Sequence, residues 1–221
     1  MSGDILGYRE FYRRNLPHYQ PESGVFSVTY RLDFPLAKHI VEKISSQKIE
    51  FAKYQSKIDE SKRYSKAIDF QIKQFFFIDD YLGLCRRGHK YLSNPGVANV
   101  VAESLLYMNG IQYELFCYCI MPNHVHVLLK PIEKEDGSYY SLAEIMKGHK
   151  GSTARRTNIL LNRKGRFWHA ESYDHLVRSQ QEFENTVWYI VNNPVKARLV
   201  DDYRKWKHYW VKESIREDLS L

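Results

Sequence analysis

Residues 112–131, QYELFCYCIMPNHVHVLLKP, decide the fold prediction. The first part, 112–120, is almost wholly apolar and aromatic, which is typical of a buried strand. Residues 121–123, Met-Pro-Asn, form a tight turn, and the run HVHVLL over 124–129 has the composition of a second strand. Two such runs joined by a short turn predict a β-hairpin.

The second strand of this hairpin carries two histidines, His124 and His126, separated by one valine. Because side chains alternate between the two faces of a strand, both imidazoles project to the same side. Two imidazoles so placed can bind one divalent metal ion, although an ordinary pair of surface or core-edge histidines has the same spacing. Both strands are strongly apolar, so buried imidazoles here need a polar partner to offset their desolvation.

The other elements follow from hydrophobic periodicity and capping signals. A strand is expected at 24–34, and helices are expected after the Asn94-Pro95-Gly96 turn, from about Ser141 and over about 180–193. The order predicts a single α+β domain over 1–221, with an antiparallel sheet that carries helices on one face. Two additions are expected: a polar helical insertion at about 37–80, and a basic, aromatic C-terminal tail at about 201–221.

The helix expected over 180–193 carries a second candidate group. Tyr189 and Asn193 are four residues apart, so they share one stripe of that helix. A tyrosine at the edge of a docking face commonly serves only in packing, and an asparagine before proline commonly marks a helix end. The helix alone therefore leaves the role of both residues open.

Composition limits the class of protein. The chain has 221 residues, of which 43% are hydrophobic and 27% charged, as in soluble globular proteins. Three cysteines are too few for a disulfide scaffold, and the CxC at 117–119 has no second pair for zinc, so a cytoplasmic protein is expected. No secretory signal and no membrane span are expected, because the N-terminus lacks an apolar core and no apolar run reaches the required length.

Charge indicates a polyanionic partner. The formal net charge is +7, and residues 145–170 contain seven basic residues and no acidic one. These are Lys147, Lys150, Arg155, Arg156, Arg163, Lys164 and Arg166. A solvated helix face has a similar composition but normally mixes both signs. Trp168, within the same stretch, is equally consistent with base stacking and with a core position.

Four motifs together resemble one known family. They are RRNLPHYQPESGVFSVTYRL (13–32), YCIMPNHVHVLLKP (118–131), FWHAESYDHLVRS (167–179) and WYIVNNPVKARLV (188–200). In this order and spacing, they resemble the REP-associated tyrosine transposases, which are single-tyrosine transposases of the HUH (His-hydrophobic-His) endonuclease superfamily. The segment 37–80 is longer than in that family.

The resemblance implies a fold and a set of roles. The fold would be the HUH endonuclease fold, a ferredoxin-like antiparallel sheet with helices packed on it. His124, His126 and Asn193 would hold one Mg²⁺ or Mn²⁺, and Tyr189 would be the nucleophile. The chain departs from the family at Arg198, where glycine is usual, which puts the geometry of the helix end in doubt.

The resemblance also implies a substrate. This would be single-stranded DNA that forms a hairpin from a palindromic repeat. The enzyme would cleave it through a 5′-phosphotyrosine intermediate during transposition, and the protein would be nucleoid-associated when bound to DNA. The seven basic residues and Trp168 would then contact DNA. The sequence leaves open whether the chain is a monomer or a homodimer.

Two other functions stay open at this point. One is a domesticated hairpin-binding protein with vestigial cleavage, and the other is a replication-initiation or relaxase-type member of the superfamily. The intact set of candidate residues favours the transposase.

Overall fold

The structure is a computed structural model that describes residues 23–83 and 88–221. Its centre is a five-stranded sheet in the order β4-β1-β3-β2-β5, with every neighbouring pair antiparallel. The strands are β1 (Val25–Leu32), β2 (Tyr113–Ile120), β3 (His124–Pro131), β4 (Trp168–Val177) and β5 (Tyr209–Val211). Residues 13–22 of the first motif and Cys85 lie outside the described residues.

The predicted hairpin is confirmed as β2 and β3, and it places β3 in the middle of the sheet. In the register, Cys119 lies opposite His126 on one side and Thr29 of β1 lies opposite His126 on the other. His126 is therefore flanked by strands on both sides, which excludes water and fixes the backbone around it. The antiparallel α+β architecture expected from the sequence is confirmed.

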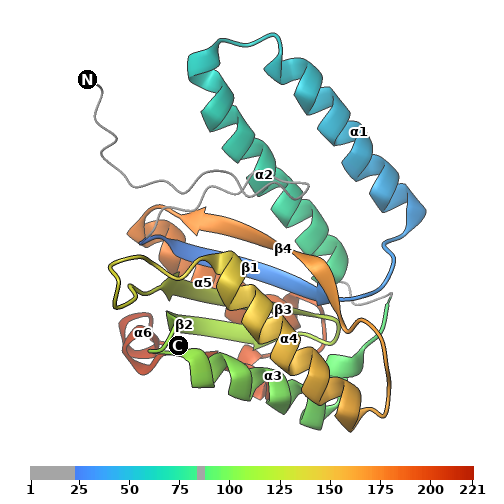
Figure 1. Cartoon of the computed structure of the whole chain (residues 1–221), viewed down its shortest axis with the longest axis vertical. Coiled ribbons are helices and arrows are strands. Elements are labelled where there is room, and N and C mark those ends of the chain that lie inside the picture. The colour runs from blue at the N-terminus through green and yellow to red at the C-terminus, as the bar shows by residue number, and fades with distance from the viewer. Residues whose placement is uncertain (1–22, 84–87) are drawn as a thin grey trace.

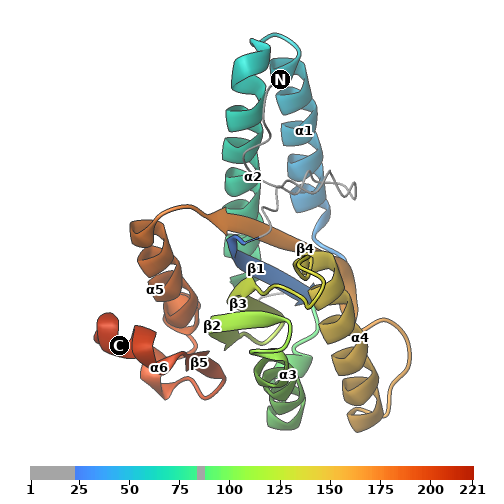
Figure 2. The same cartoon turned by 60° about the vertical axis from the view of Figure 1, so that its left-hand side comes forward.

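Helices cover both faces of this sheet, whereas the sequence analysis expected them on one (Figure 2). Val125 and Val127 pack with residues of α3 (Pro95–Met108) and α4 (Leu142–Leu160). On the other face, Leu128 packs with Val187 and Ile190 of α5 (Gln180–Lys196). Because side chains of β3 alternate, His124 and His126 share the α5 face with Leu128.

Local signals fix the helix starts. Ser141 and Glu144 form the expected capping box at the start of α4, and the Asn94 side chain caps α3 ahead of Pro95. Ser179 caps α5 by accepting a hydrogen bond from the backbone of Glu182. Val187, Ile190 and Val191 of α5 pack in the cluster that contains Leu128, and this packing sets which way the neighbouring Tyr189 faces.

The insertion is a pair of antiparallel helices, α1 (Lys38–Gln55) and α2 (Glu60–Gly83), that extends away from the sheet (Figure 1). Phe51 and Phe70 stack between the two helices with ring centroids 4.1 Å apart. The C-terminal end of α2 reaches back to the sheet, where Asp79 accepts a hydrogen bond from Thr29 of β1. The insertion therefore contacts the same face that carries the histidines.

The C-terminal tail folds onto the body. After the short helix η2 (Tyr203–Lys205), β5 pairs with β2, and α6 (Glu213–Asp218) follows. Trp206 donates a hydrogen bond to the carbonyl of Ile120, and Trp210 stacks on Tyr118. The 3₁₀ helix η1 (Tyr91–Ser93) precedes α3. Trp206 and Trp210 therefore attach the C-terminal tail to β2.

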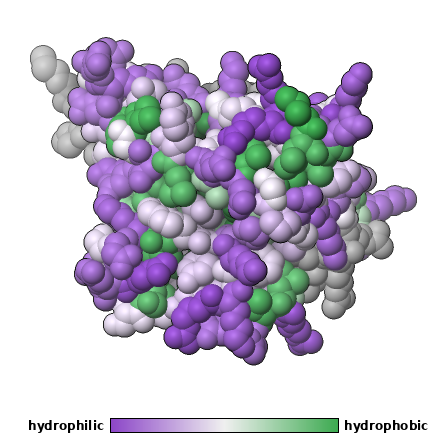
Figure 3. Space-filling view, turned by 90° about the horizontal axis from the view of Figure 1, so that it is seen from below, coloured by the Kyte–Doolittle hydropathy of each residue, from purple (hydrophilic) through white to green (hydrophobic). Residues whose placement is uncertain are grey.

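The surface seen from below in Figure 1 is largely hydrophilic, with separate apolar patches (Figure 3). Within 23–83 and 88–221, no helix has the length and apolar character that a bilayer span requires.

Candidate metal and nucleophile site

The histidines of β3 form the centre of the site. His124 and His126 are fully buried, and their Nε2 atoms lie 2.9 Å apart. The Nδ1 atom of His124 donates to the Asn123 side-chain oxygen at 2.6 Å, so its Nε2 carries a lone pair. The Nδ1 atom of His126 lies 2.9 Å from the Thr29 hydroxyl. Two Nε2 atoms this close need a proton or a cation between them, so the pair fits a metal ion.

Asp79 at the end of α2 completes a donor set. Ligand atoms of Asp79, His124 and His126 all lie within 4.8 Å of one another, and all three residues are buried. The Oδ1 atom of Asp79 is 3.5 Å from Nδ1 of His126. One carboxylate with two imidazoles is a donor set for a transition-metal ion such as Mn²⁺ or for Zn²⁺, whereas Mg²⁺ favours oxygen alone.

Tyr189 of α5 contacts both Asp79 and His126. Its hydroxyl donates a hydrogen bond to the Oδ2 atom of Asp79. Its ring lies edge-on to that of His126, with centroids 6.1 Å apart, and Phe76 of α2 packs against it with centroids 5.7 Å apart. The two oxygens of Asp79 thus face different groups: Oδ1 faces His126, and Oδ2 faces the phenol.

Asn193 lies one helical turn after Tyr189 and is 2% exposed. Its side-chain amide donates to the carbonyl oxygen of Tyr189 at 2.9 Å, which leaves the amide oxygen available. Asn193 and Asp79 line the same cavity of about 630 Å³. The role of Asn193 as a metal ligand stays a prediction. For Asp79, a carboxylate oxygen lies within 4.8 Å of a ring nitrogen of each histidine.

Burial sets the charge state of the site. Burial, and then the neighbouring His126, lowers the pKa of His124 to about 3. Burial, and then Lys196, lowers the pKa of His126 to about 3. Burial raises the pKa of Asp79, and burial followed by the Asp79 charge raises the pKa of Tyr189 well above its usual range. Neutral imidazoles are the form that binds metal, and the phenol is fully protonated at neutral pH.

The basic run lies elsewhere. Most of it belongs to α4 and the following loop, and α4 lies on the sheet face opposite to the histidines. Lys147, Arg155, Arg156, Lys164 and Arg166 are exposed. Three of the seven have partners within the protein: Lys150 donates to backbone carbonyls of His169, Ala170 and Glu171, Arg156 pairs with Glu103, and Arg163 binds Asn158.

Trp168 is a core residue. It is 4% exposed, its ring nitrogen donates to the Thr153 hydroxyl at 2.9 Å, and its ring packs edge-on against Tyr30 and Phe167. The sequence is consistent with base stacking or with a core position for Trp168, and these contacts are those of a core position. Trp168 is therefore not among the proposed DNA contacts.

Sequence reasoning missed Asp79. It lies in the segment expected to be an insertion, 45 positions before His124 by the numbering. A hint was available in the consecutive acidic residues Asp79 and Asp80, which end an apolar run of helical phenylalanines. Only the folded position of α2 brings this carboxylate to the histidines.

Comparison with known proteins bears on this site. Residues 85–193 match the family described as "Transposase IS200 like", a range that includes His124, His126, Tyr189 and Asn193. A Haemophilus influenzae protein named as a REP-associated tyrosine transposase is 25% identical over 101 residues. That alignment covers 43% of this chain and 57% of the relative, so the chain spans little more than half of that protein.

A solved structure has a similar fold. It is titled as a REP-associated tyrosine transposase bound to a REP hairpin, and it matches with a TM-score of 0.50 and 13% identity. The match covers 91% of this chain and 82% of the other. Residues 85–193 thus match the IS200-like transposase family, and the resemblance of the chain to the REP-associated tyrosine transposases, which its four motifs indicate, is confirmed.

Proposed function

We propose that this chain is a metal-dependent endonuclease and strand transferase that acts on hairpin-forming single-stranded DNA. Tyr189 is the nucleophile, and the product is a 5′-phosphotyrosine link with a free 3′-hydroxyl on the other side. The proposal depends on one observation: the half-buried Tyr189 hydroxyl meets the buried cluster of the Asp79 carboxylate and the two Nε2 atoms.

The hydrogen bond to Asp79 supplies the proton acceptor for Tyr189. An ordinary tyrosine has a pKa of about 10, and here burial raises the pKa further. Tyr189 is therefore a neutral phenol before the reaction and must lose its proton during the attack. As the phenol oxygen bonds to phosphorus, its proton passes to Oδ2 of Asp79. The bond from phosphorus to the 3′-oxygen breaks, and the departing 3′-alkoxide takes a proton from water to become the free 3′-hydroxyl. The raised pKa of Asp79 makes its carboxylate a better base.

His124, His126 and Asp79 are the residues that would hold the metal ion, with Asn193 as a further candidate. A bound divalent ion would withdraw charge from a non-bridging phosphate oxygen and orient the phosphorus. The protein prepares this site by burial, which keeps both imidazoles neutral, and by Asn123 and Thr29, which orient the rings.

The DNA partner is supported by charge and by kinship. The net charge of +7 favours a polyanion, and the exposed basic residues of the 147–166 run are candidate phosphate contacts. The solved structure of similar fold is titled as bound to a REP hairpin.

A second function is a hairpin-binding protein that no longer cleaves. The exposed basic residues of the 147–166 run are expected in a protein that only binds DNA as well as in one that cleaves it. The buried cluster favours the enzyme, because a protein that only binds DNA has no use for two fully buried, mutually facing imidazoles beside a tyrosine.

The test is formation of a covalent complex. Single-stranded oligonucleotides from the palindromes flanking the gene are incubated with the protein and Mn²⁺, and the adduct is resolved in denaturing gels. Wild type should form an adduct, and Tyr189→Phe should form none while binding the same DNA. Tyr107→Phe, at a ring that is 71% exposed, is the matched control. An adduct in Tyr189→Phe would exclude this nucleophile, and its absence in wild type would favour the hairpin-binding function.

A further inference from the structure

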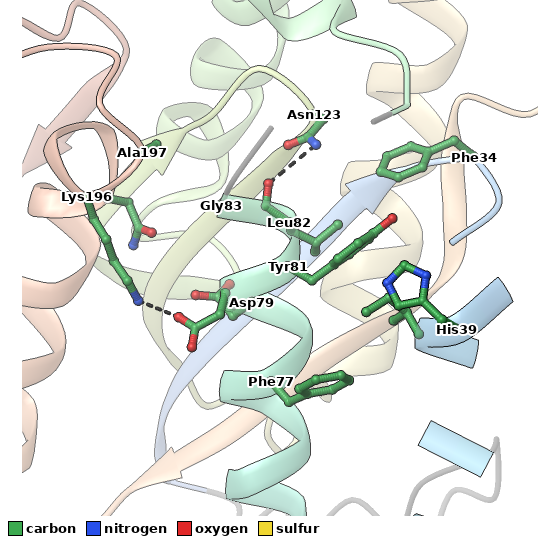
Figure 4. A pocket seen from close by; sticks show the side chains of 13 residues that line it. Phe34, His39, Phe77, Asp79, Tyr81, Leu82, Gly83, Asn123, Lys196 and Ala197 are labelled. Atoms are coloured by element: carbon green, nitrogen blue, oxygen red, sulfur yellow. Dashed lines mark hydrogen bonds and ion pairs between the residues drawn. The ribbon is translucent and has the colours of Figure 1, made fainter. Parts of the chain in front are cut away.

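Lys196 occupies a distinctive position beside the nucleophile. It is seven residues after Tyr189 on α5, and its Nζ lies 5.1 Å from the centroid of the Tyr189 ring. The same Nζ is 2.5 Å from Oδ1 of Asp80, on the inserted helix α2. Figure 4 shows Lys196 close to Asp79, and the dashed line from Lys196 marks its ion pair with Asp80, which joins α5 to α2. The resemblance assigns neither Lys196 nor Asp80 a role.

This ammonium group acts on the site and is open to solvent. After burial, the charge of Lys196 is the next cause of the lowered pKa of His126, so Lys196 is electrostatically close to the candidate metal ligands. Its side chain is 54% exposed, and it borders the cavity that Asp79 and Asn193 also line. A phosphate that reacts with Tyr189 would bind beside a ring whose centroid is 5.1 Å from this ammonium nitrogen.

The present partner of Lys196 is easily replaced. The Asp80 side chain is 59% exposed, and exposed ion pairs add little to protein stability. A carboxylate and a phosphodiester each carry one negative charge. Exchange of one for the other therefore preserves the number of charged contacts of the lysine, and it leaves Asp80 free to be hydrated.

We propose that Lys196 binds the scissile phosphate of the DNA, and that Asp80 of the inserted helix holds Lys196 over Tyr189 until the phosphate replaces it. Lys196 would touch the reacting phosphate directly, whereas Asp80 is a positioning residue that acts through Lys196. The insertion then lowers the affinity for phosphate at the active site. This inference rests on the proposed function.

Chemical removal of the phosphate charge tests the contact without cleavage. In a Tyr189→Phe background, binding is measured for an oligonucleotide that wild type cleaves, and for the same oligonucleotide with a neutral methylphosphonate at the scissile position. Lys196→Ala should weaken binding of the natural DNA roughly tenfold or more, as expected for a lost charge-assisted hydrogen bond. It should leave binding of the methylphosphonate DNA unchanged. Equal losses for both DNAs would overturn the assignment.

Two further variants separate the roles. Asp80→Asn should tighten binding of the natural DNA several-fold and leave the methylphosphonate DNA unaffected, because it frees Lys196. If Asp80 only tied α2 to α5, Asp80→Asn would weaken binding, and this result would overturn the exchange. Lys66→Ala, an exposed lysine in the other half of α2, is the matched charge control. Adduct formation by wild type tests the proposed function separately, so the two failures are distinguishable.

Discussion

The Tyr189 hydroxyl donates a hydrogen bond to the Asp79 carboxylate, although 110 positions separate the two residues in the chain. Tyr189 lies within the region that matches the transposase family, whereas that match begins at residue 85, after Asp79. Helix α2, which precedes the matched range, therefore supplies a carboxylate to the candidate site. The segment predicted as an insertion contacts the candidate site and is not only an appendage.

If Asp79 is a ligand, Asp79→Asn should weaken Mn²⁺ binding at least tenfold, because a neutral amide replaces the anionic donor. Titration calorimetry of the protein without DNA measures this directly. Asp69→Asn, at an exposed position of the same helix, is the control. Unchanged Mn²⁺ affinity in Asp79→Asn would leave the site to the histidines and Asn193.

The sequence predicts the parts of the fold that are encoded locally. The β2–β3 hairpin follows from two apolar runs around Met121-Pro122-Asn123, and the start of α4 follows from its capping box. These signals depend on neighbours within a few residues. The positions of His124 and His126 on one face follow from strand alternation alone.

Long-range relationships were not predictable in this way. β4 has mixed polarity, WHAESYDHLV, because it lies at the sheet edge with one neighbour, so no clear alternation marks it. The three-residue β5 is too short for periodicity to reveal. The position of Asp79 depends on how α2 packs on β1, a contact between segments 50 positions apart.

Arg198 adopts a conformation that favours glycine. It follows the C-terminal end of α5 with φ of 57°, in the left-handed region. The family resemblance places glycine at this position. Arg198→Gly should raise the free energy of unfolding by about 1 kcal/mol, because it removes the steric cost of a side chain there. Urea unfolding measures the change.

A glycine-to-alanine change at another position in the left-handed region, Gly110, serves as the control for Arg198→Gly. Gly110 has φ of 79° and open space around it, so Gly110→Ala should lose stability through backbone strain alone. A loss of stability in Arg198→Gly would show that contacts of the arginine outweigh the strain.

His149 makes stability depend on pH. It is buried between the Tyr30 hydroxyl at 2.6 Å and the Ser104 hydroxyl at 2.9 Å, and burial, followed by Lys150, lowers its pKa to about 3. Between pH 6.5 and 3 the unfolded chain binds a proton at this site and the folded protein does not, so stability falls as pH falls. From pH 7 to pH 5 this histidine should cost about 2 kcal/mol.

The variant His149→Gln isolates this contribution, because glutamine keeps polar groups but does not titrate. It should be less stable than wild type at pH 7, yet lose about 2 kcal/mol less on going to pH 5. Urea unfolding at both pH values gives the comparison, and each protein serves as its own reference. Identical pH dependence in both proteins would mean that His149 takes up a proton between pH 7 and pH 5 in the folded protein as it does in the unfolded chain, and would contradict the prediction.

Arg155 tests whether α4 contacts DNA away from the site. It is exposed on the face of the sheet opposite to Tyr189, so its contribution to binding is electrostatic and independent of the chemistry. Arg155→Ala should reduce the slope of log affinity against log salt by about 0.7 to 0.9, the value for one phosphate contact. The rate of adduct formation at saturating DNA should not change. Hairpin binding measured at several salt concentrations checks the slope, with Lys66→Ala as the control for loss of one surface charge. An unchanged slope would mean that Arg155 contacts no phosphate.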